Sequence, residues 1–321
     1  MHVAKKSKLF LLFSIAALYG FLIKAALNPT IPSQENPVVF YSNQKRDDLR
    51  LVLRKLFLKA QKSIDLTMYA ATDPELLQKL EDRAQKGVCV KIRHDPSNPI
   101  DSALAIPTKA KGLMHRKVVV IDDRIVLLGS ANMTTSSLLM HDNLSVAFDH
   151  PPLAIFLKNP TGSIFDFEVN HQKAKLWLLP DRNGCLYLEQ QLEAAKESIF
   201  IAMFTLTHPA LLEKIIQAHQ KGLKITVAVD HYAARGASKK AVQYLLSKGV
   251  EVVFSQGLQL LHHKWAYIDR KKIVLGSTNW TKAAFTKNQD CLLFLDDLTK
   301  AQQKVFDTLC KTIQLESIKA L

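Results

Sequence analysis

The feature that most constrains this sequence is that it repeats itself. Residues 60–95 (AQKSIDLTMYAATDPELLQKLEDRAQKGVCVKIRHD) align without gaps on residues 195–230 (AKESIFIAMFTLTHPALLEKIIQAHQKGLKITVAVD), an offset of 135 residues (195 − 60). Further along, HRKVVVID at 115–122 resembles HHKWAYID at 262–269, an offset of 147 residues (262 − 115). Such a period far exceeds that of solenoid repeats, which is roughly 20–50 residues. The sequence therefore predicts two domain-sized halves.

Each copy predicts the same order of elements: a helix, a strand, a second helix, a second strand, and two strands joined by a polar turn. The second helix has Pro74 or Pro209 in its first turn and Gly87 or Gly222 after its end, positions that these residues favour. Helices that alternate with strands are typical of an α/β fold. We therefore expect two duplicated α/β halves, with mixed sheets flanked by helices, packed about a pseudo-twofold axis.

The two copies differ in one segment. The second half has a predicted helix and strand at 238–254, where the first half has a loop at 96–112 that is rich in Pro and small residues. The predicted division of the chain is an N-terminal hydrophobic helix (1–27), a first half (38–150), a linker (151–174) and a second half (175–321).

The N-terminal segment resembles a secretory signal. Lysines precede an apolar run, 9–23, that ends at Lys24, and no small-x-small cleavage site follows. A spanning helix needs roughly 17–25 residues, which residues 9–27 supply if Lys24 snorkels. The pattern favours a signal anchor over a cleaved signal peptide, with a buried N-terminal helix as the third alternative. We therefore expect an exported or membrane-anchored protein.

The net charge restricts the kinds of partner. At +14, it favours anionic partners: nucleic acid, an acidic membrane surface or a phosphorylated small molecule. The four cysteines show no CxxC or Cys/His spacing typical of zinc sites. We therefore expect neither a metal nor another cofactor.

A His-x-Lys pair in each half provides the candidate catalytic groups. Residues two apart on a strand face the same side, so His115 would lie beside Lys117, and His262 beside Lys264. A neutral imidazole is a nucleophile or base near pH 7, and an ammonium group binds phosphate. If the halves pack about a twofold axis, one imidazole could attack phosphorus while the other protonates the leaving oxygen. A single pair would more often be a solvated strand edge, but two copies at matching places favour a site.

Other repeated polar residues surround these pairs. Asp122 and Asp269 lie at the turn that ends each strand, where Asp commonly caps the backbone, so we interpret them as structural. GSAN and GSTN follow in the two halves and supply a further set: Ser130, Asn132, Ser277 and Asn279. These side chains either cap the next helix or donate to phosphate, and both alternatives stay open. Histidines without a duplicate, such as His141, are predicted to be surface or core residues.

Both motif copies resemble the His-x-Lys-x4-Asp pattern of the phospholipase D superfamily, and GSAN and GSTN are similar to its Gly-Ser-x-Asn. The resemblance covers roughly residues 38–295. GSTNWTKAAFTKNQD is similar to the mitochondrial cardiolipin hydrolase and bacterial nuclease branch. Members with one motif build the site by dimerising, so a chain with two motifs is expected to act as a monomer.

The resemblance also implies site roles. It implies a phosphohistidine intermediate with His115 and His262 as the catalytic pair, Lys117 and Lys264 as phosphate ligands, and Asn132 and Asn279 in support. A downstream acidic residue orients a histidine in this family; Asp290 occupies that place in the second half, whereas the first half has Asn143. The two histidines are therefore inequivalent, and His115 is the expected nucleophile.

The substrate does not follow from the fold. Our first hypothesis is hydrolysis of a phospholipid to phosphatidic acid and a headgroup alcohol at a membrane surface, because the apolar N-terminus would hold the domain beside lipid. The second is a metal-independent endonuclease that acts on single-stranded nucleic acid, which the positive charge would attract equally. A phosphatidyl transferase ranks third, and a binding module without activity ranks last.

Overall fold

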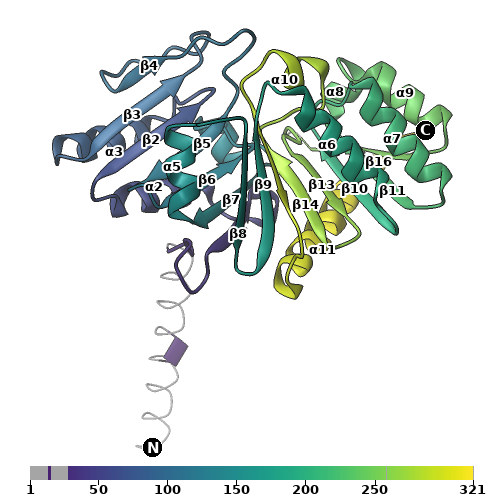
Figure 1. The fold of residues 1–321 in the computed structure, drawn as a ribbon, viewed down its shortest axis with the longest axis horizontal. Coiled ribbons are helices and arrows are strands. Elements are labelled where there is room, and N and C mark those ends of the chain that lie inside the picture. Colours follow the sequence, from purple (N-terminus) through teal and green to yellow (C-terminus); the bar gives the residue numbers. More distant parts are fainter. Residues whose placement is uncertain (1–13, 16–27, 258, 321) are drawn as a thin grey trace, which may run out of the picture.

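The computed structural model describes residues 14–15, 28–257 and 259–320. Two α/β halves lie side by side, each built on a mixed sheet with helices on its faces (Figure 1). The duplicated α/β fold predicted from the sequence is confirmed.

The first sheet has seven strands within the described residues, in the order β1-β7-β6-β5-β2-β3-β4. β2 pairs in parallel with β3 and antiparallel with β5, so the sheet is mixed. The strands of this half are β1 (Val38–Ser42), β2 (Ser63–Met68), β3 (Cys89–His94), β4 (Ala105–Pro107), β5 (Lys117–Ile121), β6 (Ile125–Gly129) and β7 (Leu144–Asp149). The helices are η1 (Asn43–Lys45), α2 (Leu49–Lys59), α3 (Pro74–Gln85), α4 (Thr135–Leu139) and α5 (Pro151–Lys158).

The second sheet has nine strands in the described part of the chain, in the order β16-β12-β11-β10-β13-β14-β15-β9-β8. Its strands are β8 (Ile164–Val169), β9 (Gln172–Leu178), β10 (Ser198–Met203), β11 (Lys224–Val229), β12 (Glu251–Ser255), β13 (Lys264–Ile268), β14 (Lys272–Gly276), β15 (Cys291–Leu295) and β16 (Ser317–Lys319). Its helices are α6 (Arg182–Glu193), α7 (Pro209–Gln220), α8 (His231–Arg235), α9 (Lys239–Ser247), α10 (Lys282–Thr286) and α11 (Lys300–Leu315).

The repeated sequence produces a repeated sheet. The strand order β3-β2-β5-β6-β7 of the first half recurs as β11-β10-β13-β14-β15 in the second. The equivalent helices α3 and α7 begin with Pro in the first turn, as predicted. Each is followed by a glycine, Gly87 or Gly222, at a φ of 86° that favours glycine over other residues.

The halves also differ as the sequence indicates. α9 and β12 occupy the predicted helix and strand, whereas the matching loop of the first half contains only the short β4. Residues 151–174, expected as a linker, contain α5, β8 and the start of β9, and the β8–β9 hairpin extends the second sheet beside β15. The exact division into domains stays a prediction.

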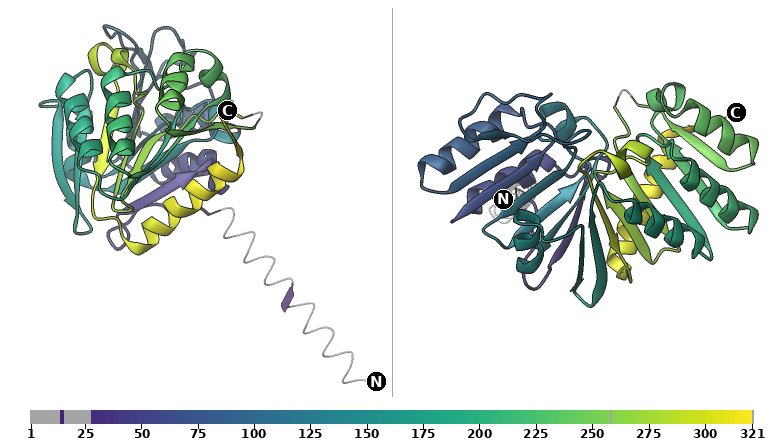
Figure 2. Two further views of the ribbon diagram at one scale, coloured as in Figure 1. Left: turned by 90° about the vertical axis from the view of Figure 1, so that its right-hand side faces the viewer. Right: turned by 45° about the horizontal axis from the view of Figure 1, so that its top comes forward.

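One apolar core joins the two halves. The same cluster contains Val146 and Phe148 from β7 and Leu293 from β15, all fully buried. In a second view the strands of both halves meet along the middle of the molecule (Figure 2). Each large apolar side chain buried there contributes roughly 1.5–3 kcal/mol. This shared core holds the sheet ends that carry the motifs in fixed relative positions.

The motif aspartates tie each sheet to the helix before it. The Asp122 carboxylate accepts hydrogen bonds from the backbone N–H groups of residues 61–63 at 2.7–2.8 Å. Asp269 accepts from residues 196–198 in the same way, at 2.7–3.0 Å. These N–H groups lie where α2 and α6 give way to β2 and β10, so each aspartate joins the end of its strand to a distant helix–strand junction.

The predicted N-terminal helix (1–27) lies outside the described residues except for 14–15. Elsewhere in the described ranges, no helix has the length and apolar character needed to cross a membrane. The prediction of an exported or membrane-anchored protein has no support among these helices, so it is corrected and not carried further.

We predict that Asp122→Ala lowers the free energy of unfolding by about 2–4 kcal/mol, because three backbone donors lose one charged acceptor. Asp101→Ala, at an exposed loop position, serves as the control. Urea denaturation followed by circular dichroism measures both. Equal stability of the two variants would show that the three contacts of Asp122 contribute nothing.

Candidate active site

Two reciprocal contacts between the halves place the motif histidines. Met114 bridges to Gln289, and Leu261 bridges to Asp142. The members of the two bridges correspond across the 147-residue offset (114 + 147 = 261; 142 + 147 = 289). Such exchange of equivalent contacts is typical of twofold symmetry. Each bridge lies one residue before a motif histidine, so it fixes that histidine against the opposite half.

The histidines precede their strands instead of lying within them. β5 begins at Lys117 and β13 at Lys264, two residues after the histidine in each case. The sequence predicts that each His-x-Lys pair lies within one strand. Only the lysine of each pair does so, and the histidine lies before the strand. The histidine belongs to the cross-half bridge, and His115 donates its backbone N–H to the carbonyl of Gln289 at 2.7 Å.

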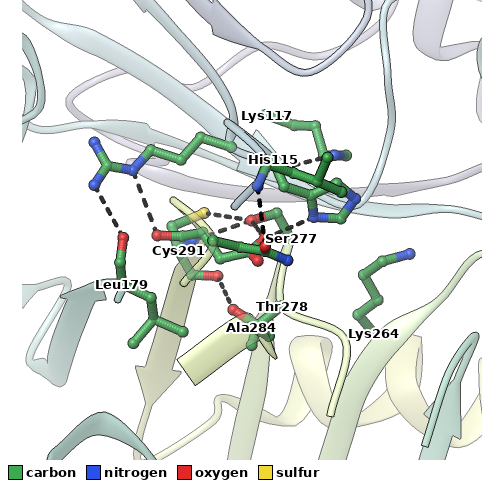
Figure 3. A network of polar contacts seen from close by, with 12 residues as sticks. His115, Lys117, Leu179, Lys264, Ser277, Thr278, Ala284 and Cys291 are labelled. Atoms are coloured by element: carbon green, nitrogen blue, oxygen red, sulfur yellow. Dashed lines mark hydrogen bonds and ion pairs between the residues drawn. The ribbon is translucent and has the colours of Figure 1, made fainter. Parts of the chain in front are cut away.

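His115 is held by a carboxylate from the other half. Its Nδ1 lies 2.8 Å from Oδ1 of Asp290, a fully buried residue immediately before β15. The Ser277 hydroxyl donates to the same oxygen at 2.6 Å (Figure 3). Burial raises the pKa of Asp290, but His115 and Lys117 outweigh it and keep that pKa below its usual value. Because the ionised carboxylate can only accept, the imidazole proton is on Nδ1, which leaves the Nε2 lone pair free.

His262 is held by an amide. Its Nδ1 lies 3.0 Å from Oδ1 of Asn143 in the first half. The Asn143 Nδ2 donates to the carbonyl of Ser137 at 2.7 Å, which turns the amide oxygen toward the ring, and the Ser130 hydroxyl donates to that oxygen at 2.9 Å. The oxygen accepts only, so His262 also carries its proton on Nδ1. The two halves thus provide the same geometry with a charged partner for one histidine and a neutral partner for the other.

Two lysines are buried beside the histidines. Lys117 and Lys264 are 1% and 2% exposed, and each donates from Nζ to the backbone carbonyl of the histidine two residues earlier. Tyr69 and Phe204 place their rings 5.0 and 5.1 Å from these ammonium groups. Neither lysine has an ion-pair partner among the described residues, and Figure 3 shows both on the same side of the hydrogen-bond network.

Burial controls the electrostatics of the four groups. Burial lowers the pKa of Lys117 to about 7, although the nearby Asp290 acts in the opposite direction. The pKa of Lys264 is lowered by burial and by the positive charge of Lys117. Burial and Lys117 lower the pKa of His115, which Asp290 partly restores. Burial, Lys264 and Lys117 lower that of His262. The pocket therefore carries neutral imidazoles near pH 7 and favours the arrival of a negative charge.

The serines and the asparagines of the Gly-Ser-x-Asn motifs have different contacts. Ser277 and Ser130 bind the residues that hold the histidines. The side-chain oxygens of Asn132 and Asn279 are buried without a hydrogen-bond partner in the described structure, so these amides are not committed to helix caps. A Cβ atom on Gly276 would overlap the carbonyl oxygen of Cys291, which explains why glycine stands before the serine.

Several site residues are missing from the sequence prediction. Asp95 and Asp230 accept the backbone N–H of Met114 and Leu261 at 2.7 and 3.0 Å, immediately before each histidine. Their repetition at the end of the first aligned segment was the available signal. His141, expected to be an ordinary surface or core residue, places its ring 6.0 Å from that of His262. It has no duplicate, so no pattern marked it.

Comparison with known proteins gives one matching family model, described as "Cardiolipin synthase, PLD-like domain", at residues 53–159 and 188–309. A mitochondrial cardiolipin hydrolase from Xenopus laevis is 34% identical over 122 residues, 37% of this chain and 57% of that protein. A phospholipase D from Rickettsia typhi is 24% identical over 135 residues, 42% of this chain and 66% of that protein. The chain thus spans about half to two thirds of the length of these curated relatives.

Among solved structures, a phosphatidylserine synthase from Haemophilus influenzae has the same fold, with a TM-score of 0.71 and 15% identity. The match covers 92% of this chain and 90% of that one. The family model matches more than half of the chain in two separate segments, one in each structural half. The protein therefore belongs to the phospholipase D-like family and carries the family's domain twice.

Proposed function

We propose that the protein is a metal-independent phosphodiesterase that hydrolyses a phospholipid to phosphatidic acid and the headgroup alcohol through a phosphohistidine. The observation that carries this proposal is the cross-half arrangement of His115 and His262, each with Nδ1 bound and Nε2 free. Beside them lie two lysines that have no ion-pair partner among the described residues. Both motifs are in one chain, so we expect the monomer to be active.

In the first step, Nε2 of His115 attacks phosphorus and the bond from phosphorus to the headgroup oxygen breaks. Nε2 of His262 donates its proton to that oxygen, so the headgroup leaves as a neutral alcohol. When the substrate binds, its negative charge next to His262 raises the pKa of that imidazole, which then takes up a proton from solvent. The product is a phosphatidyl group bound to His115.

In the second step, His262 accepts a proton from water, and the oxygen attacks phosphorus. The bond from phosphorus to His115 breaks, phosphatidic acid leaves, and His115 returns to its neutral form. His262 is left protonated for as long as the phosphate group stays in the site.

The difference between Asp290 and Asn143 supports this division of roles. A phosphorylated imidazole is a cation for the lifetime of the intermediate, and the Asp290 carboxylate stabilises that charge. It also makes Nε2 of His115 more basic and therefore a better nucleophile. His262 has to release its proton in one step and accept it in the next, and the neutral Asn143 orients its ring without holding the proton.

The lysines and amides bind the phosphate. Lys117 and Lys264 reach the site from both halves, where they neutralise charge on the non-bridging oxygens of the transition state. Asn132 and Asn279 would donate amide hydrogens from Nδ2 to the same oxygens.

Three observations bear on the substrate. The curated relatives are called cardiolipin hydrolase and phospholipase D, which favours a phospholipid. Exposed aliphatic side chains near the site, Leu113 and Met140, also suit lipid. The net charge of +14 supports the second candidate, an endonuclease on single-stranded nucleic acid.

We predict that His115→Ala and His262→Ala each lower phospholipid turnover by about 10³-fold or more. With a p-nitrophenyl ester, whose leaving group needs no proton, we expect His262→Ala still to release nitrophenol in a burst, whereas His115→Ala does not. His171→Ala, at an exposed hairpin turn, is the control. A burst from His115→Ala and none from His262→Ala would reverse the assigned roles.

We predict that the purified protein, assayed in EDTA, releases headgroup from phospholipid vesicles faster than it cleaves single-stranded DNA or RNA. Parallel assays with labelled substrates measure both rates. Faster cleavage of nucleic acid that weakens steeply with salt would support the endonuclease instead. Loss of both activities in EDTA would refute metal independence.

We predict that Lys117→Met stabilises the free protein and weakens phosphate binding. The pKa of Lys117 is lowered from 10.5 to about 7 by burial, so between these values the unfolded chain binds a proton that the folded chain lacks. Stability of the wild type therefore rises with pH across this window, and the rise is smaller in the variant.

Thermal unfolding at several pH values, with and without inorganic phosphate, measures both effects. Phosphate should raise the unfolding temperature of the wild type at pH 7 more than that of Lys117→Met. The control is Lys91→Met, at an exposed position of β3. If phosphate stabilises both lysine variants as it does the wild type, Lys117 does not bind the anion.

A further inference from the structure

Aliphatic side chains are exposed on one side of the site. Leu139 and Met140, at the end of α4, are 47% and 56% exposed. They immediately precede His141, whose ring lies 6.0 Å from that of His262. The α4 helix is short, and Asn143 anchors the turn after it by donating to the Ser137 carbonyl at 2.7 Å. These two apolar tips are thus held in place beside the second motif histidine.

Basic side chains gather on the opposite side of the site. Lys111, Arg182, Lys282 and Lys287 are exposed and line a cavity of about 910 Å³ at α10 and the start of α6. Within the described chain, none of the four has an ion-pair partner. The one acid of the cavity, Asp181, is already bound by the Ser163 hydroxyl and the Asn183 N–H. The cavity therefore has an excess of positive charge.

The two sides occupy equivalent places around the site. Lys287 and Met140 correspond across the 147-residue offset (140 + 147 = 287), and each lies two residues before a member of a cross-half bridge. The Lys287 carbonyl accepts the Gly112 N–H at 2.9 Å, which places the lysine next to Leu113, itself 40% exposed. The site is thus flanked by an apolar rim (Leu139, Met140) and a basic rim (Lys111, Lys287), with Leu113 beside the latter.

We propose that these two rims form a docking surface for the interface of an anionic phospholipid bilayer. The occupant follows from complementarity. Unpaired lysines attract the anionic headgroups, and the aliphatic tips enter the boundary between headgroups and acyl chains, the combination that gives peripheral binding. A single strand of nucleic acid would be expected to find aromatic stacking faces beside the basic groups, and the apolar rim offers only Leu and Met.

This inference rests on the proposed phospholipid activity and deepens it. It requires no membrane span, because the rims act at the surface. The scissile phosphodiester of a lipid lies at the same depth as the headgroups, so docking by the rims brings that group to the level of His115 and His262. The rims contribute to capture of the bilayer and leave the chemical steps unchanged.

The test compares two rim variants with two matched controls. Leu139→Ser/Met140→Ser removes the apolar tips, and Ile155→Ser changes an equally exposed side chain on α5. Lys111→Glu/Lys287→Glu reverses the basic rim, and Lys300→Glu/Lys304→Glu makes the same change at exposed positions of α11. Sedimentation with vesicles of phosphatidylcholine and phosphatidylglycerol measures binding. Headgroup release is measured on these vesicles and on monomeric dihexanoyl phospholipid.

We expect each rim variant to lose about tenfold or more of vesicle binding and vesicle turnover, with turnover of the monomeric lipid unchanged. The controls should match the wild type. Vesicles without phosphatidylglycerol should bind the wild type weakly, and the lysine reversal should then make little difference.

Two results would overturn the proposal in ways that separate it from the proposed function. If the rim variants bind and hydrolyse vesicles like the wild type, the docking role of the rims is refuted and the phospholipid activity is retained. If the wild type hydrolyses neither lipid, the proposed phospholipid activity is refuted. Sedimentation with vesicles still shows whether the rims bind the bilayer. Binding of a single-stranded oligonucleotide that needs the lysines, together with no binding to anionic vesicles, would assign the basic rim to nucleic acid.

Discussion

The site depends on hydrogen bonds that cross from one half of the chain to the other. His115 is fixed by Asp290, and His262 by Asn143, so neither half contains a complete histidine environment of its own. These bonds are possible because the shared apolar core sets the two sheets at a fixed distance. Buried polar groups are costly when they lack partners, so the network favours the relative position of the halves in which Nδ1 of each motif histidine has its acceptor.

The same arrangement concentrates positive charge where water is excluded. Two buried ammonium groups without acidic partners oppose folding, because burial disfavours their charged forms. The rest of the structure has to compensate for this loss of stability. A bound phosphodiester reduces the loss because its negative charge stabilises the ammonium groups. Such a conflict between local stability and charge is typical of functional sites. It explains why the lysines are held by backbone carbonyls instead of carboxylates, which would neutralise them before substrate arrives.

Duplication placed the two histidines in matching frameworks, and one exchanged residue gave their Nδ1 atoms partners of different charge. Asp290 and Asn143 occupy matching positions and accept hydrogen bonds from matching imidazoles and from matching serine hydroxyls. Only the charge differs. A symmetric site would provide no basis for choosing which histidine attacks, whereas this pair stabilises a cation on His115 more than on His262. The roles that we propose follow from that single difference.

Much of the fold was predictable from the sequence, because the repeat, the helix-ending glycines and the apolar strands are local patterns. The motif residues were predictable for the same reason. Contacts between the halves were not: His115 and Asp290 are separated by 175 residues, and no local period connects them. The roles of Asp95 and Asp230, which hold the backbone before each histidine, and the exposed rims also depend on tertiary structure. The membrane-anchor prediction rested on the composition of residues 1–27, and no helix in the described part of the chain supports it.

The central claim is that both imidazoles act on one phosphorus atom, with His115 as the nucleophile. It is tested most directly by acid-free quenching of His262→Ala during reaction with a nitrophenyl phosphatidyl ester, followed by peptide mass spectrometry. We predict a phosphatidyl adduct on His115, which accumulates because this variant lacks the base that activates water. An adduct on another residue, or turnover without any adduct, would contradict the account.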